Sequence, residues 1–150
     1  MKRAIARTTL VVAFATVLAL GVVSRARAQV CEHPNALLNG SFAYTSTGAL
    51  LPVYAQHFAG PFAEVGIQTF DGNGSTQATA TLSANGNVQQ VTIQGTYTVN
   101  ADCTGGSMTL LVLPFQSTVH VDFVIDGGGT EVRAIVTDTG VVESRVYTKR

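Results

Sequence analysis

Apolar and polar residues alternate along most of the chain after residue 38. The pattern is clearest over 75–99, where alanine, leucine, valine and isoleucine take every second position, with threonine, glutamine and serine between them. A period of two is typical of strands with one buried face. No segment after Val23 has the 3.6-residue apolar stripe and caps of an amphipathic helix. The alternation predicts strands over 38–47, 50–58, 62–70, 75–84, 88–99, 106–113, 117–125, 130–138 and 141–148.

Turn-forming residues separate these segments. Glycine, asparagine and aspartate, which tolerate the positive φ of tight hairpin turns, cluster at 71–74, 85–87, 102–106, 126–129 and 138–140. Short connections join sequential strands as antiparallel neighbours, and closure removes both unpaired edges. We therefore predict an all-β fold, an antiparallel up-and-down meander of about eight strands closed into a barrel. Valine, isoleucine, leucine and alanine should lie inside, and a two-sheet sandwich is the alternative.

The first residues follow a different pattern. A basic stretch precedes residues 8–23, which are almost wholly apolar, and the small residues of Ala26-Arg27-Ala28 follow. This three-part pattern is that of a secretory signal peptide cleaved after Ala28. The apolar run of about 16 residues is shorter than the roughly 20 that cross a bilayer as a helix. We therefore predict a signal peptide helix over 1–28, a single β-barrel domain over 29–150, and a secreted or periplasmic protein.

Cleavage would change the charge of the chain. Residues 29–150 keep all nine acidic residues but only four of the nine basic ones, so the net charge becomes −5. An acidic surface with no basic patch argues against nucleic acid and anionic lipid as partners. The remaining chain has no apolar run that predicts stable membrane insertion. An outer-membrane barrel is disfavoured because the chain has no tryptophan for the aromatic girdles of such barrels.

The two cysteines predict a disulfide. Cys31 and Cys103 are the only cysteines, and export would bring them to an oxidising compartment. In the chain-entropy model, closing a loop of this length stabilises a fold by about 4 kcal/mol. No cysteine and histidine set has zinc spacing, and the 71–74 turn lacks the distal glutamate of a calcium loop. The sequence therefore predicts neither a metal site nor a cofactor.

Several turn and strand motifs carry a family resemblance. They are Thr69–Gly74, Gly95–Gly105, Asp122–Gly128, Glu131–Arg133 and Thr137–Gly140. With them the chain from about residue 38 onward resembles a largely uncharacterised family of small exported bacterial β-barrel proteins. The resemblance implies a barrel similar to the calycin and allene oxide cyclase-like barrels, which is a likeness of fold. It implies no catalytic residue.

The fold class limits the functions to consider. An eight-stranded barrel is either filled by side chains or holds one small ligand, and the small residues Gly66, Ala78, Ala80 and Gly95 leave room inside. We therefore predict that a small, mostly apolar molecule binds in the lumen. The alternatives are a structural or surface-interaction domain without a ligand, and a cyclase or isomerase-type enzyme. A cavity of several hundred cubic ångströms would favour ligand binding. The pattern favours binding over catalysis and leaves the oligomeric state open.

Four residues are candidates for ligand binding. His57 and Glu64 flank Gly60-Pro61, in a connection that we expect to cover one mouth of the barrel. Glu131 and Arg133 share one face of a predicted strand and would hold a polar group of the ligand if they pointed inward.

The next predicted strand repeats this charge pattern with Glu143 and Arg145. Because the opposite face of the 130–138 strand is apolar, the alternation favours solvent exposure for both acid–arginine pairs, as surface ion pairs worth less than about 1 kcal/mol each.

His120 and Asp122 also share a face of a predicted strand. A carboxylate beside an imidazole can orient it for proton transfer. The apolar side of this strand is the opposite one, and no serine nucleophile stands in a matching motif. The pair is therefore interpreted as a solvent-facing pair rather than part of a catalytic triad.

Overall fold

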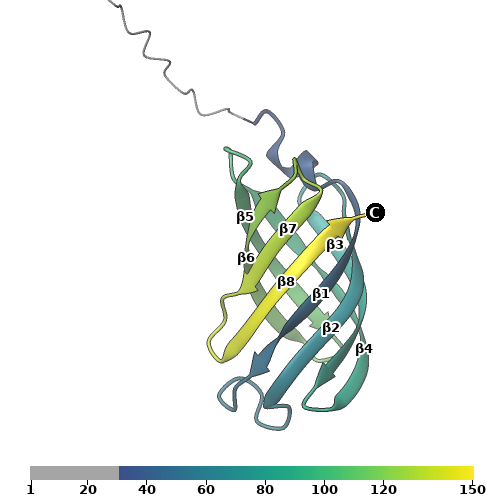
Figure 1. Cartoon of the computed structure of the whole chain (residues 1–150), viewed down its shortest axis with the longest axis vertical. Coiled ribbons are helices and arrows are strands. Elements are labelled where there is room, and N and C mark those ends of the chain that lie inside the picture. Colours follow the sequence, from purple (N-terminus) through teal and green to yellow (C-terminus); the bar gives the residue numbers. More distant parts are fainter. Residues whose placement is uncertain (1–30) are drawn as a thin grey trace, which may run out of the picture.

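The chain forms a closed barrel of eight antiparallel strands (Figure 1). The computed structural model describes residues 31–150, so the predicted signal peptide over 1–28 lies outside the described residues. A short 3₁₀ helix, η1 (Pro34–Leu38), precedes the strands. They are β1 (Gly40–Leu50), β2 (Gly60–Phe70), β3 (Ser75–Ala84), β4 (Asn87–Val99), β5 (Gly105–Leu113), β6 (Ser117–Asp126), β7 (Glu131–Val136) and β8 (Val141–Lys149). Each strand pairs with the next, and β8 pairs with β1. The predicted all-β barrel is confirmed, and the sandwich is not formed.

The predicted strand over 50–58 is wrong. β1 continues to Leu50, and residues 51–59 form a looped connection, named the lid loop below. Pro52 has no N–H to offer to a strand ladder. The loop instead makes short turns, in which Tyr54 N donates to Leu51 O (2.9 Å) and Phe58 N donates to Ala55 O (3.1 Å). The meander therefore has eight strands, and the longest connection crosses one end of the barrel.

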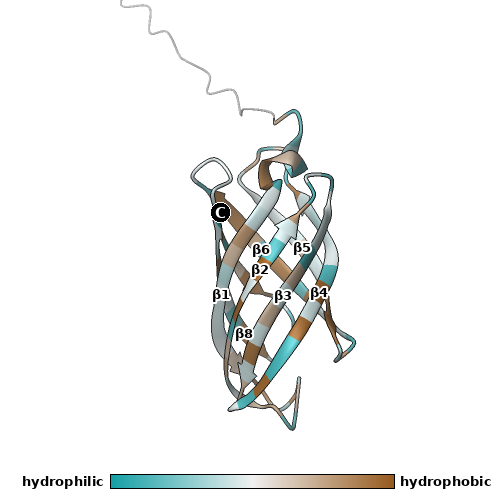
Figure 2. Ribbon diagram, turned by 90° about the vertical axis from the view of Figure 1, so that its right-hand side faces the viewer, coloured by the Kyte–Doolittle hydropathy of each residue, from teal (hydrophilic) through white to brown (hydrophobic). Residues whose placement is uncertain are grey.

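Inner and outer residues alternate along every strand, and Figure 2 shows this as successive polar and apolar bands. The expectation that valine and isoleucine lie inside is wrong for β2. Val65 and Ile67 are 58% and 40% exposed, whereas Glu64 faces the lumen. The aromatic residues at the two ends of β2, Phe62 and Phe70, share the inner face with Glu64. Two large rings therefore determine the orientation of this strand more strongly than two β-branched residues, which also suit exposed strand positions.

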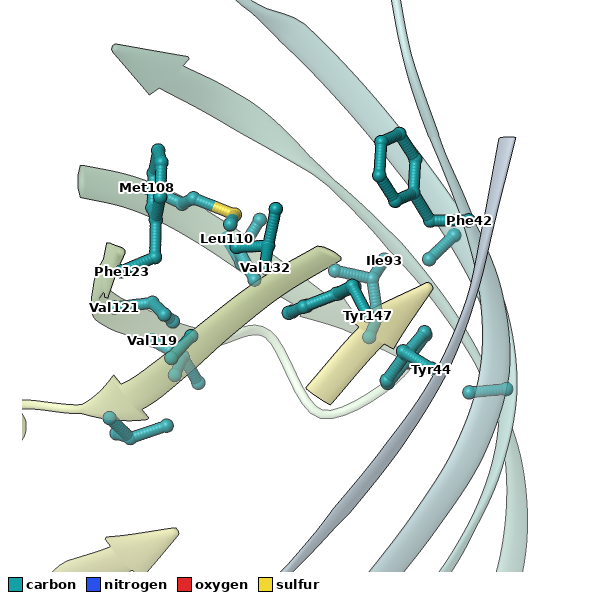
Figure 3. Packing of buried hydrophobic residues seen from close by; sticks show 14 of the residues in the cluster. Phe42, Tyr44, Ile93, Met108, Leu110, Val119, Val121, Phe123, Val132 and Tyr147 are labelled. Atoms are coloured by element: carbon teal, nitrogen blue, oxygen red, sulfur yellow. The ribbon is translucent and has the colours of Figure 1, made fainter. Parts of the chain in front are cut away.

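One half of the lumen is filled by aromatic side chains. Phe70 lies at the centre, with its ring 5.3 Å from that of Phe42 and 5.1 Å from that of Tyr97, both edge-on. The Tyr147 ring lies 6.3 Å from Phe70 on another side. Figure 3 shows Phe42 and Tyr147 among the inward-pointing residues of this core. Such edge-to-face pairs add to the stabilisation that burial gives. We call this half the closed end.

The N-terminal segment seals the closed end. Leu38 of η1 is fully buried and belongs to the hydrophobic core of the barrel. The Asn35 side-chain oxygen accepts a hydrogen bond from Val99 N (2.8 Å), and the Tyr97 hydroxyl donates to Asn35 O (2.9 Å). The predicted disulfide between Cys31 and Cys103 is confirmed, and it joins this segment to the β4–β5 turn. The segment therefore acts as a plug held by both hydrogen bonds and a covalent link.

Candidate functional site

The opposite half of the lumen is hollow. A cavity of about 510 Å³ opens at the end where the lid loop and the β3–β4, β5–β6 and β7–β8 turns lie. Most of its walls are apolar, and they include Phe58, Phe62, Leu82, Val112, Phe115 and Val119. The lumen of such a barrel is expected to be either packed or hollow, and this barrel contains a region of each kind. We call this half the open end.

The lid loop covers part of the cavity mouth. The connection expected there was Gly60-Pro61, but those residues belong to β2, and the cover is formed by residues 51–59 instead. The hydroxyl groups of Tyr54 and Ser117 are 2.7 Å apart, and this hydrogen bond fastens the loop to β6. The rings of Phe58 and Phe115 lie 6.0 Å apart between the loop and the β5–β6 turn. His57 belongs to the same loop, but its side chain is exposed and does not line the cavity.

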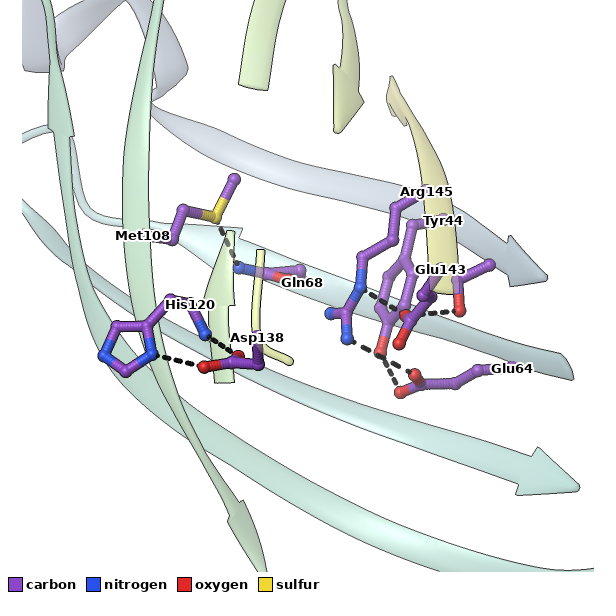
Figure 4. Close-up of polar contacts among 9 residues, drawn as sticks. Tyr44, Glu64, Gln68, Met108, His120, Asp138, Glu143 and Arg145 are labelled. Carbon is purple, nitrogen blue, oxygen red and sulfur yellow. Dashed lines mark hydrogen bonds and ion pairs between the residues drawn. The ribbon is translucent and has the colours of Figure 1, made fainter. Parts of the chain in front are cut away.

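Polar side chains gather on one side of the cavity, on the neighbouring strands β8, β1 and β2 (Figure 4). We call them the lumen cluster: Tyr44, Ser46, Glu64, Glu143 and Arg145, all buried. Arg145 Nε donates to Glu143 Oε1 (2.6 Å), and the Ser46 hydroxyl donates to the same oxygen (2.7 Å). The Tyr44 hydroxyl donates to Glu64 Oε1 (2.5 Å). The two carboxyl groups therefore have separate partners.

The strand register brings these residues together. Ser46 of β1 stands opposite Glu64 on one side and Arg145 on the other. Gly48 stands opposite Glu143, and a Cβ there would lie only 1.7 Å from the carbonyl oxygen of Val142. Glycine at this position therefore allows β1 and β8 to approach closely beside the cluster.

Burial and neighbouring charge set the protonation of the lumen cluster. Burial raises the pKa of Glu64, and the nearby Glu143 raises it further, against the opposing effects of Arg145 and Tyr44. Burial also raises the pKa of Tyr44, with a contribution from Glu64, so this phenol remains a hydrogen-bond donor. Burial disfavours the charge on Arg145, but Tyr147, Glu143 and Glu64 together raise its pKa. Arg145 is therefore a permanent cation, and Glu64 binds a proton more readily than an exposed glutamate.

Arg145 and Glu64 each keep hydrogen-bonding capacity that the other residues of the lumen cluster do not use. Arg145 Nη1 is buried and makes no hydrogen bond with any residue of the described part of the chain. Arg145 Nη2 is 3.9 Å from Glu64 Oε2, which is beyond hydrogen-bond distance. Both residues line the cavity. A bound molecule can therefore find a donor and a carboxyl oxygen on the same wall.

The structure separates the four predicted ligand-binding residues. Glu64 lines the cavity, whereas Glu131 and Arg133 lie on the outer face of β7. Arg133 Nη2 is 2.7 Å from Glu131 Oε1, and the side chains are 63% and 35% exposed. This is the orientation that the alternation favoured for them. Neither residue belongs to the lumen.

The exposure expected for Glu143 and Arg145 is wrong. Both point inward on β8, while Val142 and Val146 on the alternate positions are exposed. Tyr147 lies on the same face as the two charged residues and is completely buried in the aromatic core. The large Tyr147 ring identifies the inner face of β8. The two valines on the other face had suggested the opposite orientation.

His120 is exposed, as interpreted from the sequence, but its partner is not Asp122. Its Nδ1 is 2.8 Å from Asp138 Oδ1, and its backbone N donates to Asp138 Oδ2 (2.6 Å). The contact ties β6 to the β7–β8 turn on the outer surface. Within residues 31–150, no group of three or more histidine, cysteine, aspartate or glutamate side chains is placed to hold a metal ion. No helix in that range has the length and apolar character to cross a membrane.

Neither a protein-family model nor a curated protein matches the sequence. Among solved structures, the chain is similar to EF1p2_mFAP2b bound to DFHBI, with a TM-score of 0.53 and 10% sequence identity. The match covers 79% of this chain and 99% of that chain. At this identity the likeness concerns the fold alone. It supports a small β-barrel without singling out the calycin or allene oxide cyclase-like barrels.

Proposed function

We propose that this protein is an exported barrel that binds a small, mostly apolar molecule in the open end of its lumen. The observation that carries the proposal is the cavity of about 510 Å³, with apolar walls and a polar cluster on one side. Small-molecule sites typically have volumes of about 300–1,000 Å³, apolar linings and a few polar groups that orient the ligand. A ligand that buries its apolar surface against these walls would bind favourably, because that surface leaves water.

Two further observations support the proposal. EF1p2_mFAP2b, a solved barrel of similar fold, is bound to the small molecule DFHBI. The disulfide between Cys31 and Cys103 suits an oxidising compartment outside the cytoplasm. We therefore propose that residues 1–28 direct export and that 29–150 are the mature ligand-binding domain.

Fluorescence titration of the purified protein with N-phenyl-1-naphthylamine, an uncharged apolar dye, tests the binding. We expect saturable binding and a rise in melting temperature, because a ligand that binds only the folded state stabilises it. The variant Ala84→Phe places a ring in the cavity from β3 and should abolish binding while the fold persists. Ala63→Phe makes the same change on the outer face of β2 and should bind like the wild type. Absence of saturable binding, or unaltered binding by Ala84→Phe, contradicts the proposal.

A cyclase or isomerase-type enzyme on the same barrel is a second candidate, supported by Glu64 alone. A carboxyl group with a raised pKa beside an apolar cavity is a common proton donor or acceptor in catalysis. Glu143 and Arg145, by contrast, are engaged with each other. One buried carboxyl supports catalysis less strongly than the whole cavity supports binding.

A further inference from the structure

We infer that the ligand carries an uncharged oxygen head group, an alcohol or a ketone, bound between Glu64 and Arg145, and that the cavity discriminates against carboxylate and ammonium head groups. This inference rests on the proposed function and deepens it. It assigns to the ligand a chemical class that an apolar cavity alone would not define.

The arrangement of the cavity walls gives the ligand a direction. Glu64, Glu143 and Arg145 are the charged residues that line the cavity, and they lie on β2 and β8 with β1 between them. The walls formed by β3, β5 and β6 are apolar apart from Ser117, which is engaged with Tyr54. A ligand that buries its apolar body against those walls therefore presents its polar end to the lumen cluster.

The hydrogen bonds within the cluster show which groups remain for that polar end. Glu143 is already engaged by Arg145 Nε and by the hydroxyl of Ser46. Glu64 uses Oε1 for the Tyr44 hydroxyl. Its Oε2 lies 3.9 Å from Arg145 Nη2, too far for a direct hydrogen bond. One ligand oxygen can lie within hydrogen-bond distance of both groups at once.

An alcohol fits this gap in either protonation state of Glu64. Its oxygen accepts from the Arg145 guanidinium, and its O–H donates to an ionised Glu64 or its oxygen accepts from a protonated one. A ketone accepts from Arg145 and from protonated Glu64. Burial makes this protonated form more accessible, because it raises the pKa of Glu64. An uncharged oxygen therefore completes the cluster without adding charge to it.

A charged head group would be placed against a like charge. The cluster holds two carboxyl groups and one guanidinium, and Arg145 already pairs with Glu143. When Glu64 is ionised, a ligand carboxylate would add a third negative charge beside Glu64 and Glu143. An ammonium group has no acceptor, so it could not accept a hydrogen bond from Arg145 and would place its positive charge beside the guanidinium. Like charges at hydrogen-bonding distance repel strongly in a buried site, because burial lowers the effective dielectric constant. A charged ligand would also lose its hydration on entering the cavity.

Competition among four ligands of equal chain length tests the inference. Decan-1-ol, decan-2-one, decanoate and decylammonium would each displace N-phenyl-1-naphthylamine from the wild-type protein at pH 7, below their aggregation concentrations. We expect the alcohol and the ketone to bind at least about tenfold more tightly than either ion, because even part of the repulsion exceeds the free energy of a tenfold change. Equal affinities, or tighter binding of either ion, would overturn the inference and leave the proposed function intact. If neither the dye nor any of the four binds, the proposed function fails and this inference fails with it.

The variant Glu64→Gln assigns the discrimination to its source. Glutamine keeps the size and polarity of the side chain but cannot be ionised. We expect the disadvantage of decanoate relative to decan-1-ol to shrink several-fold. Glu131→Gln, the same change on the outer face of β7, should leave that ratio unchanged. An unchanged ratio in a folded Glu64→Gln protein would show that Glu64 does not select the head group. The ranking on the wild-type protein tests the inference even if this variant does not fold.

Discussion

The two ends of the barrel are made by the same eight strands, yet their interiors differ. At the closed end, Phe42, Phe70, Tyr97 and Tyr147 fill the lumen, and η1 and the disulfide seal it. At the open end, a cavity of about 510 Å³ lies beneath a loop, beside buried charges. Most strands therefore contribute to the packed core over one part of their length and line the cavity over another, as β1, β2, β3, β5, β6 and β8 do.

This contrast shows how a small barrel can contain a site that lowers its own stability. Side chains that line an open cavity pack against fewer neighbours than those of a filled core. Buried ions also lose hydration, and their pairing compensates for that loss only in part. Both costs fall at the open end. The aromatic burial and the covalent link of the closed end offset them, because the hydrogen-bonded strands of one closed sheet connect the two ends. The comparison predicts that equivalent changes at the two ends have unequal effects.

Removing one phenylalanine from each end tests most directly whether the two interiors differ in stability. Phe70 is 1% exposed and contacts three other rings, so Phe70→Ala should lower the free energy of unfolding by about 4 kcal/mol. Phe62 is 9% exposed and borders the cavity, where one side of its ring already lacks neighbours. Phe62→Ala should therefore lower it by about 2 kcal/mol or less. Urea denaturation measures both values.

The same pair of variants should show the reverse order in ligand binding. Phe62→Ala removes part of the cavity wall and should weaken dye binding, whereas Phe70→Ala should leave it unchanged in the folded fraction. Equal losses of stability, or weaker binding in Phe70→Ala only, would mean that the two ends do not have separate roles.

The pH dependence of stability should come from the open end, because the buried carboxyl groups of the described chain, Glu64 and Glu143, lie there. The pKa of Glu64 is raised above its ordinary value of 4.5, so the folded state holds its proton more tightly than the unfolded state. Its stabilising contribution is then full below about pH 4.5 and declines as pH rises through the higher folded-state pKa. The difference in unfolding free energy between the wild type and Glu64→Gln should therefore fall from pH 4.5 towards neutrality. A flat or rising difference in urea titrations at several pH values would contradict the assignment.

The strands and the disulfide of the closed end could be predicted from the sequence, but the plug formed by η1 was not predicted. Alternation, turn residues and two cysteines predicted the strands, the barrel and the disulfide. These features depend on local chemistry, in which a period of two or a positive φ is encoded within a few residues. The lid loop shows the limit of that approach. Its apolar residues resembled a strand, while Pro52 gave the contrary signal.

The open end could be predicted only in part. Glu64 was a candidate, but Glu143 and Arg145 were expected outside because Val142 and Val146 occupy the alternate positions of β8. The face that turns inward depends on how Tyr147 packs against residues of other strands, such as Phe70. The cavity depends even less on local sequence, because its volume is set by side chains from strands and loops far apart in the chain. Alternation predicts where a strand lies, but the packing of its largest side chains decides which face points into the barrel.

A smaller effect is expected from the hydrogen bond that holds the lid loop over the open end. The hydroxyl groups of Tyr54 and Ser117 are 2.7 Å apart, and both residues line the cavity mouth. Tyr54→Phe removes this hydrogen bond but keeps the ring. The free energy of unfolding should fall by about 1 kcal/mol or less, because the contact is only partly buried. Dye dissociation, measured by stopped-flow fluorescence, should accelerate several-fold as the loop opens more often.

A double-mutant cycle makes the test specific to this contact. Ser117→Ala removes the same hydrogen bond from the β6 side, so each single variant should accelerate dissociation equally. The double variant should be no faster than either one, because the bond can be lost only once. Additive accelerations would show that the two side chains act on the ligand independently. In that case the lid loop would be held by other contacts, of which the Phe58–Phe115 ring pair is the nearest alternative.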